Sequence, residues 1–515
     1  MMGNNESQLP VLRLGTRDSL LARTQSRLVA DSLMRAHPGL RVELVGFSTR
    51  GDKDQQTPLS VVDDAQFFSA ELDTALAAGD VDLCVHSWKD IDGERPAEFV
   101  RAAVPVRAFP HDVILFRSDV MERVRANKTL RIGTCSVRRQ INTADFLRWA
   151  LPACDTAPQL EFLSLRGPVD ERVRHIAQDA SEPLDAVVIA LAGLERLWQD
   201  AEGREAIRPF LTDARWMVMP LSEAPAAAAQ GALAVESRAD NDVCRALLQA
   251  IHDPATEQHV QTEQGLLSEH GEAASRCGAT VISHAELGYV AYVRGRSGDG
   301  SIIRQTRTAN AATITHKGAR RWSGTVWQQS CRKQPIPGVA ERTCKTAAAV
   351  FVAHADALTG ARPAATPRYW TSGPSSWRRL AEQGIWVEGC ADDLGFESVR
   401  ELLQTPVLQL PALEHWAALT HRDATDSWSD SGIGNVVATY AIDVELDEQQ
   451  TRRELAACTH FYWSSARQYR LLRPWLPAGA HHACGSGKTL RGLRAAGLSD
   501  VQPFVSRREW QQWAA

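Results

Sequence analysis

Apolar positions in the first two hundred residues follow two spacings, one typical of strands and one typical of helices. Short apolar runs end in polar turns, and each turn opens a stretch whose apolar positions recur every three to four residues. The pattern predicts strands at 12–15, 42–47 and 81–85, helices at 19–36 and 70–78, and further strand-helix pairs at 130–149, 162–176 and 186–197. Such alternation indicates doubly wound α/β domains.

Two polar motifs lie where predicted strands end. Residues 86–90 (His-Ser-Trp-Lys-Asp) follow a mostly apolar run, and residues 135–139 (Cys-Ser-Val-Arg-Arg) follow the strand that begins at Leu130. Ligands of open α/β sheets bind outside the carboxyl ends of the strands. The pattern alone therefore predicts that these two motifs contribute to a ligand site.

The pattern changes after about Thr262. A helix is followed by two short runs between Ala291 and Gln305, joined by the hairpin signature Ser-Gly-Asp-Gly at 297–300. We expect a small α+β unit over 262–307. Residues 308–345 are mixed in charge and show little sustained period, so we expect a connector there that could include short strands.

From 346 to 515 the α/β order returns with a weak internal repeat. A glycine turn opens a helix at 372–384 and again at 484–497. Two similar subdomains are therefore expected. The sequence Gly-Ser-Gly-Lys-Thr at 485–489 suggests a phosphate loop, but that motif requires a glycine where this chain has His482. Nucleotide binding is excluded on this ground, although such a turn can still hold a carboxylate through backbone N–H groups.

Composition narrows the class of protein. A chain of 515 residues with 44% hydrophobic and 23% charged residues is typical of a soluble globular protein of two to four domains. The N-terminal segment lacks the order of a signal peptide and no long apolar run follows, so we expect a cytoplasmic protein without membrane contact. The net charge of −5 argues against nucleic acid as a partner.

The ten cysteines occur singly, with no Cys-x-x-Cys pair and no histidine cluster at metal-ligand spacing. Neither disulfides nor a metal is expected.

Arginines recur at predicted strand-to-helix turns. A guanidinium beside a helix start favours bidentate binding of carboxylates, and several such turns fit a ligand with several carboxylates. For any single arginine a solvated surface charge is the alternative. Asp90 at the end of a buried strand would be a carboxylate held ionised by cations, and an exposed Lys89–Asp90 ion pair is the alternative. The arginines are Arg17, Arg138, Arg139, Arg166 and Arg172.

Seven short motifs in order resemble porphobilinogen deaminase (hydroxymethylbilane synthase) across residues 11 to about 307. They are residues 14–19, 48–52, 86–90, 133–140, 164–167, 192–194 and 230–232. The resemblance implies two interleaved domains over 11–261, similar to periplasmic binding proteins, and a third domain over 262–307. It also implies a dipyrromethane cofactor attached covalently through a cysteine thioether. Enzymes of this family join four porphobilinogen units, release ammonia and free hydroxymethylbilane.

The resemblance also implies residue roles. Asp90 would contact the pyrrole nitrogens and stabilise the cation formed on deamination, next to Lys89. The acetate and propionate groups would be held by Lys89, Arg17, Ser19, Ser136, Arg138, Arg139, Arg166 and Arg172. The attachment position falls on Cys277 when residues 283–287 anchor the comparison, and on Ala273 or Ala274 when Gly271 does. A small buried hydrophobe is the alternative role for Cys277.

Three segments depart from the family pattern. The lid segment, 61–68 here, lacks the two lysines and the glycines that are usual, the Pro-Arg-Asp motif is Pro110-His111-Asp112, and Pro168 replaces an asparagine. These departures put substrate gating and affinity in question. A deaminase half that acts only as a scaffold or as an anion-binding module is the alternative.

Residues 346–515 resemble the two-lobed uroporphyrinogen-III synthase. Enzymes of this kind need no cofactor and close hydroxymethylbilane to uroporphyrinogen III while inverting one pyrrole ring. The fused chain would then be a bifunctional transferase and lyase of heme biosynthesis, with no metal. Hydroxyl contacts to carboxylates are expected from residues that could equally be helix caps, namely Ser372, Ser375, Ser464, Ser465, Ser486 and Thr489.

Overall fold

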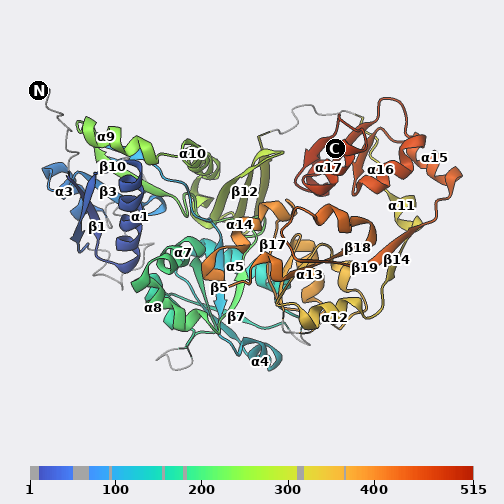
Figure 1. The fold of residues 1–515 in the computed structure, drawn as a ribbon, viewed down its shortest axis with the longest axis horizontal. Helices are drawn as coiled ribbons and strands as arrows, with labels where there is room; N and C mark the ends of the chain where they lie inside the picture. The colour runs from blue at the N-terminus through green and yellow to red at the C-terminus, as the bar shows by residue number, and fades with distance from the viewer. Residues whose placement is uncertain are drawn as a thin grey trace, which may run out of the picture. The chain divides into compact units, whose positions relative to one another are not determined.

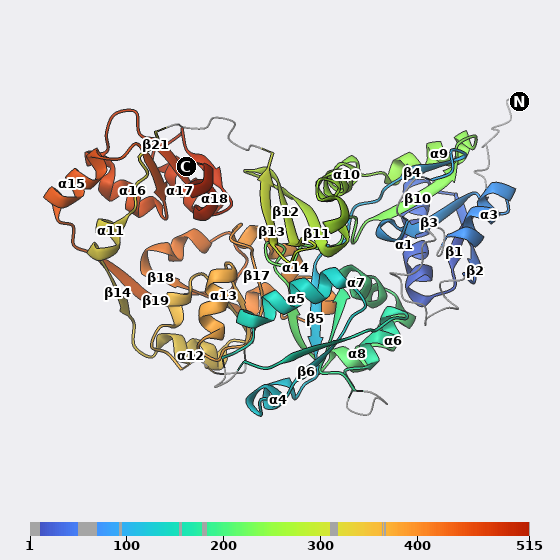
Figure 2. The same cartoon turned by 180° about the vertical axis from the view of Figure 1, so that it is seen from behind.

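A computed structural model describes residues 11–49, 69–91, 95–153, 157–177, 183–309, 318–362, 364 and 367–513. The chain divides into two compact units. The first unit comprises residues 1–144, 157–281 and 293–304, and the second comprises residues 145–156, 282–292 and 305–515. Figures 1 and 2 show the ribbon from opposite sides. Over the described ranges, every helix is too short or too polar to cross a membrane.

The first sheet of the first unit has five strands in the order β2-β1-β3-β10-β4. β1 pairs in parallel with β2 and β3, whereas β10 is antiparallel to both of its neighbours. The strands are β1 (Val11–Arg17), β2 (Arg41–Phe47), β3 (Leu83–Ser87), β4 (Phe99–Ala103) and β10 (Leu233–Arg238). Helices α1 (Leu20–Ala36), α3 (Ala70–Ala78) and α9 (Asp242–Leu248) accompany it.

Side chains that alternate along β3 bind one helix to each face of this sheet. Leu83 and Val85 pack in the same core cluster as Leu33 of α1. Cys84, which points the other way, packs with Leu72 of α3. Figure 1 shows α1 and α3 on either side of β1. The doubly wound arrangement that the alternating pattern predicts is confirmed for this sheet.

The second sheet of the first unit has the order β7-β6-β8-β5-β9. All five residues of β5 are buried. Because β5 follows β4 and β10 follows β9, the chain passes from the first sheet to the second and later returns. The strands are β5 (Asp112–Phe116), β6 (Leu130–Gly133), β7 (Leu160–Leu163), β8 (Ala186–Ala190) and β9 (Arg215–Val218). The helices are α4 (Val120–Arg125), α5 (Val137–Ala150), α6 (Val169–Arg174), α7 (Leu191–Gln199) and α8 (Ala201–Leu211).

A third, three-stranded sheet has the order β11-β12-β13. It follows α10 (Pro254–Ser268) and consists of β11 (Cys277–His284), β12 (Gly288–Arg296) and β13 (Ile302–Thr308). Ser297 N donates to Ser301 O at 3.0 Å at the turn between β12 and β13. The predicted hairpin is therefore present. Its preceding helix begins eight residues before the predicted boundary at 262.

The second unit contains a six-stranded sheet, β14-β19-β18-β15-β16-β17, and a parallel three-stranded sheet, β20-β21-β22. The strands are β14 (Cys331–Pro335), β15 (Ala349–Val352), β16 (Arg368–Thr371), β17 (Val387–Cys390), β18 (Trp416–His421), β19 (Asn435–Val444), β20 (His460–Trp463), β21 (His481–Gly485) and β22 (Gln502–Phe504). The helices are α11 (Thr325–Ser330), α12 (Val339–Thr346), α13 (Pro374–Ala381), α14 (Arg400–Leu403), α15 (Glu448–Ala456), α16 (Ala466–Leu472), α17 (Lys488–Ala495) and α18 (Arg507–Trp513).

The connector predicted over 308–345 contains a short strand in its second part. Residues 331–335 form β14, which pairs antiparallel with β19. All but the first residue of β14 are exposed. An edge strand open to solvent carries no alternation of apolar and polar positions, so the pattern gave no signal for it.

Candidate active site

The end of β3 carries the motif at 86–90 into a short 3-10 turn, Trp88–Asp90. Asp90 is exposed and Lys89 is half-buried, with its Nζ 3.4 Å from Gln230 Oε1. Desolvation lowers the pKa of Lys89 to about 8; nearby Asp90 opposes this shift and Arg139 adds to it. The turn therefore places one ammonium and one carboxylate side by side, close to the second sheet.

Arg138 and Arg139, at the start of α5, hold the buried carboxylate of Asp112. Arg138 Nη1 lies 2.7 Å from Asp112 Oδ2, and Arg139 Nε and Nη2 lie 3.0 and 2.7 Å from Asp112 Oδ1. Asp112 is fully buried and opens β5. The pKa of Asp112 lies well below its usual range because the two guanidinium charges and their hydrogen bonds outweigh its burial.

Gln230 links this arginine pair to Lys89. Its Nε2 donates to Asp112 Oδ1 at 2.9 Å and to the carbonyl of Pro110 at 2.7 Å. Its Oε1 accepts from Arg139 Nη2 at 3.3 Å as well as from Lys89. One buried amide thereby fixes the cations of both motifs relative to Asp112.

Arg172 brings a further cation to the same place. Burial lowers the pKa of Arg172 to about 10; Arg139 adds to the shift, and Asp90 opposes it. Arg166 Nη1 and Arg172 Nε are buried and have no hydrogen-bond partner among the described residues. Buried guanidinium donors without acceptors are expected where an anionic ligand binds.

The remaining first-unit candidates lie at the starts of helices or strand ends. Arg17 ends β1 and acts electrostatically on His86, whose pKa is lowered chiefly by burial. Ser19 caps α1 and accepts from Ala22 N at 3.4 Å. Ser136 Oγ accepts from Arg139 N at 3.4 Å. The two serines thus act as helix caps in this structure, and Arg17 stands next to the 86–90 motif.

Cys277 opens β11 and is 2% exposed. Burial raises the pKa of its thiol. A Cβ placed on the neighbouring Gly278 would lie 2.0 Å from the carbonyl oxygen of Pro225, so the two backbones touch there. The same carbonyl accepts from Arg138 Nη1 at 3.0 Å. Cys277 is therefore one residue from a direct contact of the arginine pair.

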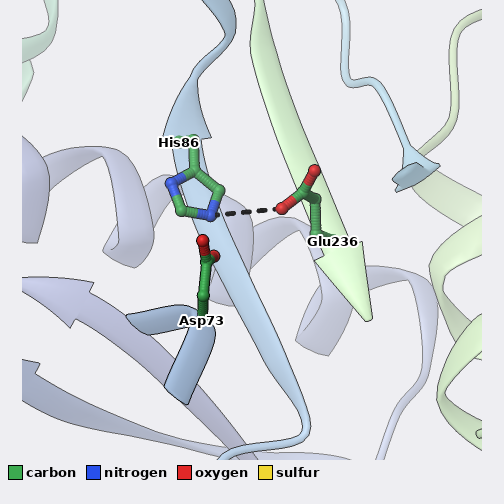
Figure 3. A group of neighbouring side chains, drawn as sticks. All are labelled: Asp73, His86 and Glu236. Carbon is green, nitrogen blue, oxygen red and sulfur yellow. Dashed lines mark ion pairs between the residues drawn. The ribbon is translucent and has the colours of Figure 1, made fainter. Parts of the chain in front are cut away.

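Asp73, His86 and Glu236 form a buried group with ligand atoms close enough to hold a metal ion (Figure 3). His86 Nε2 lies 3.5 Å from Glu236 Oε2. Arg95 Nη2, however, lies 2.6 Å from both Asp73 Oδ1 and Glu236 Oε2. A guanidinium already supplies the positive charge that these carboxylates need, so the group is an ion-pair network that supports the end of β3.

Comparison with known proteins identifies the family. Porphobilinogen deaminase of Syntrophus aciditrophicus (strain SB) is 34% identical over 299 residues, which cover 57% of this chain and 88% of that protein. The chain belongs to the porphobilinogen deaminase family. The porphobilinogen deaminases of Roseiflexus sp. (strain RS-1) and Xanthomonas oryzae pv. oryzae (strain KACC10331 / KXO85) are each 33% identical, covering 58% and 61% of this chain and 91% and 94% of those proteins. A family model described as "Porphobilinogen deaminase, dipyromethane cofactor binding domain" matches residues 12–246.

Membership of the porphobilinogen deaminase family places the chain in tetrapyrrole biosynthesis, with dipyrromethane as cofactor. The donors present fit such a group, because a dipyrromethane carries four carboxylates and the orphaned N–H groups of Arg166 and Arg172 are carboxylate donors. The solved structure of the methionine binding protein MetQ is 12% identical with a TM-score of 0.26 over 48% of this chain and 92% of that chain, too distant a likeness to support an argument.

The departures from the porphobilinogen deaminase pattern fall in different places. The lid segment 61–68 and residues 50–52 lie outside the described residues. Pro168 precedes α6 as its N-cap. His111 is buried, and its burial lowers the pKa of the imidazole to about 4, so the ring is neutral at pH 7. The position therefore supplies no cation where the family has an arginine.

Of the six second-unit hydroxyls, one caps a helix, three form other hydrogen bonds, one is exposed, and one is buried without a partner among the described residues. Ser465 Oγ accepts from Gln468 N at 3.1 Å, and Ser464 Oγ lies 3.0 Å from Gln468 Oε1. Thr489 Oγ1 donates to Ser464 O at 3.4 Å, and Ser372 Oγ lies 3.4 Å from Ser376 Oγ. Ser375 is exposed. Ser486 Oγ is buried without a hydrogen-bond partner in the part of the chain that the structure describes.

Sequence reasoning missed Asp112 as the residue that organises the arginines. The signal was present, because an aspartate directly before the apolar residues 113–116 enters a buried strand and must be paired there. Gln230 was noticed only as part of a motif. Nothing in the spacing of residues 112, 138 and 230 indicates that they meet.

Proposed function

We propose that the first unit is a hydroxymethylbilane synthase that joins four porphobilinogen molecules and releases ammonia at each addition. The observation that carries this proposal is the convergence of Lys89, Asp90, Arg139 and Arg172, which act on one another electrostatically. A carboxylate ringed by cations suits a substrate that carries two carboxylates and a leaving ammonium.

Asp90 and Lys89 are the proposed catalytic residues. The exposed carboxylate of Asp90 accepts from the pyrrole N–H and stabilises the positive charge that develops on the ring as ammonia leaves. Lys89 is charged below about pH 8 and binds a substrate carboxylate. The acetate and propionate groups are assigned to Lys89, Arg17, Ser19, Ser136, Arg138, Arg139, Arg166 and Arg172.

Among these contacts, Arg166 and Arg172 are the first choice for direct binding, since each has a buried N–H without an acceptor in the described part of the chain. Arg138 and Arg139 already bind Asp112, so their contribution is the positive field that remains after one carboxylate has been paired. A cation pair fixed by a buried carboxylate needs no reorganisation when the ligand arrives.

Cys277 is the proposed attachment residue, and its neighbour Gly278 touches the carbonyl that Arg138 also contacts. The dipyrromethane supplies the free pyrrole end on which the chain of rings grows. The protein's part is to orient that end through the arginines. The buried position of the Cys277 thiol favours the alternative, a degenerate first unit that only binds anions or acts as a scaffold.

The intact mass of the purified chain decides between these alternatives. We expect a covalent excess of two pyrrole units that is absent from Cys277→Ala and retained in Cys135→Ser, a control cysteine near Arg172. Ammonia release from porphobilinogen should follow the same order. An unmodified chain that releases no ammonia would leave the anion-binding alternative in its place.

For residues 346–515 we propose closure of hydroxymethylbilane to uroporphyrinogen III. Two observations support it: two separate sheets, and a glycine turn that opens a helix in each, Gly373 before α13 and Gly487 before α17. The proposed carboxylate contacts are Ser372, Ser375, Ser464, Ser465, Ser486 and Thr489. Fusion of both activities raises the effective concentration of the released bilane.

Isomer analysis of the product made from porphobilinogen tests this second activity. Enzymatic closure gives the isomer with one inverted ring, whereas spontaneous closure gives the non-inverted isomer. A product that consists only of the non-inverted isomer, made by a chain that does release hydroxymethylbilane, would refute the synthase proposal and leave the deaminase proposal standing.

A further inference from the structure

The turn at 485–488 before α17 belongs to the Gly-Ser-Gly-Lys-Thr sequence of the second unit, for which nucleotide binding was excluded above. Gly487 adopts a φ of +88°, and a Cβ placed there would lie 3.6 Å from Leu394 O and 3.7 Å from Gly395 Cα. The turn after β21 of the three-stranded sheet therefore meets the loop after β17 of the six-stranded sheet. Any group held at this turn lies between the two sheets of the second unit.

Lys488 is the first residue of α17, and its side chain reaches Trp428, which follows β18 of the six-stranded sheet. Its Nζ lies 3.0 Å from the centroid of the Trp428 ring. The Nζ is buried, and none of the described residues forms a hydrogen bond with it. The charged groups that act on it are Arg491 of its own helix and Glu397 of the neighbouring 3-10 turn at 396–398. An ammonium with three donors and no acceptor is costly unless a ligand supplies the acceptor.

Ser486 adds a second donor at the same turn. The residue is 8% exposed and its Oγ has no hydrogen-bond partner among the described residues. The N–H groups of the first turn of an α-helix point in the same direction and favour an anion. A buried hydroxyl, a buried ammonium and a helix start thus converge, and all three are donors.

The equivalent turn of the repeat is built differently. A Cβ placed on Gly373, before α13, would lie 1.8 Å from Asp393 Oδ1, so a carboxylate of the protein already fills that position. Desolvation raises the pKa of Asp393 to about 7, with Asp392 and Glu509 adding to the shift. The first turn is therefore supplied with its own acid, whereas the second has two donors without a hydrogen-bond partner among the described residues.

We propose that Lys488 and Ser486 form an anion site for one carboxylate of a linear tetrapyrrole. Without the ligand, the ammonium of Lys488 lies against the Trp428 ring. The choice of tetrapyrrole rests on the synthase activity proposed above, whereas the anion site does not. The carboxylate would draw the ammonium off the indole face and accept from Ser486 Oγ. The second unit would then anchor its substrate by charge at one turn only.

A charge-dependent site should follow pH. Desolvation lowers the pKa of Lys488 to about 7, Arg491 adds to the shift and Glu397 opposes it. Binding of a carboxylate should therefore weaken as pH rises through about 7, because the lysine loses its charge. The carboxylates of the ligand stay ionised over this range, since their usual pKa is about 4.

Titration of the full chain with uroporphyrin III, followed by tryptophan quenching, tests the site. Lys488→Met should raise the dissociation constant about tenfold or more, the expected loss for one hydrogen-bonded charge. Lys345→Met, which removes an exposed lysine of α12, should leave it unchanged. Ser486→Ala should weaken binding by a smaller factor. Methionine fits against an indole ring, so the melting temperature of Lys488→Met should not fall.

Two further readouts separate a ligand site from a structural lysine and from the synthase proposal. Wild-type affinity should drop between pH 6 and 8, and that of Lys488→Met should stay flat. Equal affinity of the wild type and Lys488→Met, or no binding by the wild type, overturns the site. The carboxylate assignment is overturned if uroporphyrin binding does not depend on Lys488 and millimolar inorganic phosphate displaces the uroporphyrin. A chain that binds through Lys488 but forms only the non-inverted product refutes the synthase and leaves the site.

Discussion

Asp112→Asn is the substitution that most directly tests the arrangement of the first unit. The change keeps the shape of the side chain and removes the charge that pairs Arg138 and Arg139. Both guanidinium groups are buried, at 5% and 7% exposure, so no water replaces the lost carboxylate. Breaking a buried ion pair from one side costs about 3 to 5 kcal/mol because the remaining charge stays desolvated. Here two cations of like charge remain, which favours the upper part of that range.

The loss is large against an ordinary free energy of unfolding of about 5 to 15 kcal/mol. A change of 1 kcal/mol shifts the melting temperature of a domain of about 150 to 250 residues by roughly 2 to 4 °C. The Asp112→Asn variant should therefore melt at least about 6 °C below the wild type at pH 7. Calorimetry is the assay, and the first-unit transition is the one to follow, because two units need not melt together.

The matched control is Asp240→Asn, which removes an exposed partner of Arg238 at 2.9 Å. Asp240 is 76% exposed, so its loss should change stability by less than about 1 kcal/mol.

The pKa of Asp112 is depressed, so its stabilising effect is present above the unfolded pKa of about 4 and is lost as pH falls below it. The difference between wild type and Asp112→Asn should be constant from pH 5 to 8 and shrink below pH 4. Equal melting temperatures at pH 7 would refute the ion-pair reasoning.

Three other outcomes are expected in the first unit. Asp90→Asn should lower the rate of ammonia release about a hundredfold or more and leave the melting temperature unchanged, because the exposed carboxylate acts on the substrate and not on the fold. A variant that keeps a tenth of the wild-type rate would contradict this. Gly278→Ala should destabilise the chain by about 1 to 3 kcal/mol and reduce the covalent excess of two pyrrole units, because the added Cβ meets Pro225 O. Gly298→Ala, whose added Cβ has nothing within 4 Å, is the neutral control in the same melting experiment. The KM for porphobilinogen should rise as pH passes about 8 in the wild type as Lys89 loses its charge, and a pH profile shared by Lys89→Met would show that another group titrates.

Local patterns predicted much of the fold. The helix at 70–78 was placed to the residue, and the helix predicted at 19–36 is α1 at 20–36 with Ser19 as its N-cap, because each segment carries its own apolar face or cap. The strand predicted at 81–85 is instead β3 at 83–87, since apolar character extends through the turn before the strand. The mostly exposed β14 falls in the connector over 308–345, where short strands were allowed but none was located.

The candidate site was predicted in its parts and not in its connections. Asp90, Lys89, Arg139 and Arg172 were chosen by motif and position, and the structure brings them within electrostatic range of one another. The pairing of Asp112 with Arg138 and Arg139 joins residues 26 and 27 positions apart, and Gln230 is more than a hundred residues from Asp112. Such partners are selected by tertiary packing, which local sequence patterns do not encode.

The position of β10 constrains the order in which this chain acquires structure. β10 lies between β3 and β4, yet it is made more than a hundred residues after them, once the whole second sheet has been synthesised. On the ribosome, where the N-terminal end emerges first, β3 and β4 must wait with unpaired edges until residue 238 appears. Pairing over so long a separation is slow. The second sheet, whose strands are all contiguous between 112 and 218, should thus fold before the first.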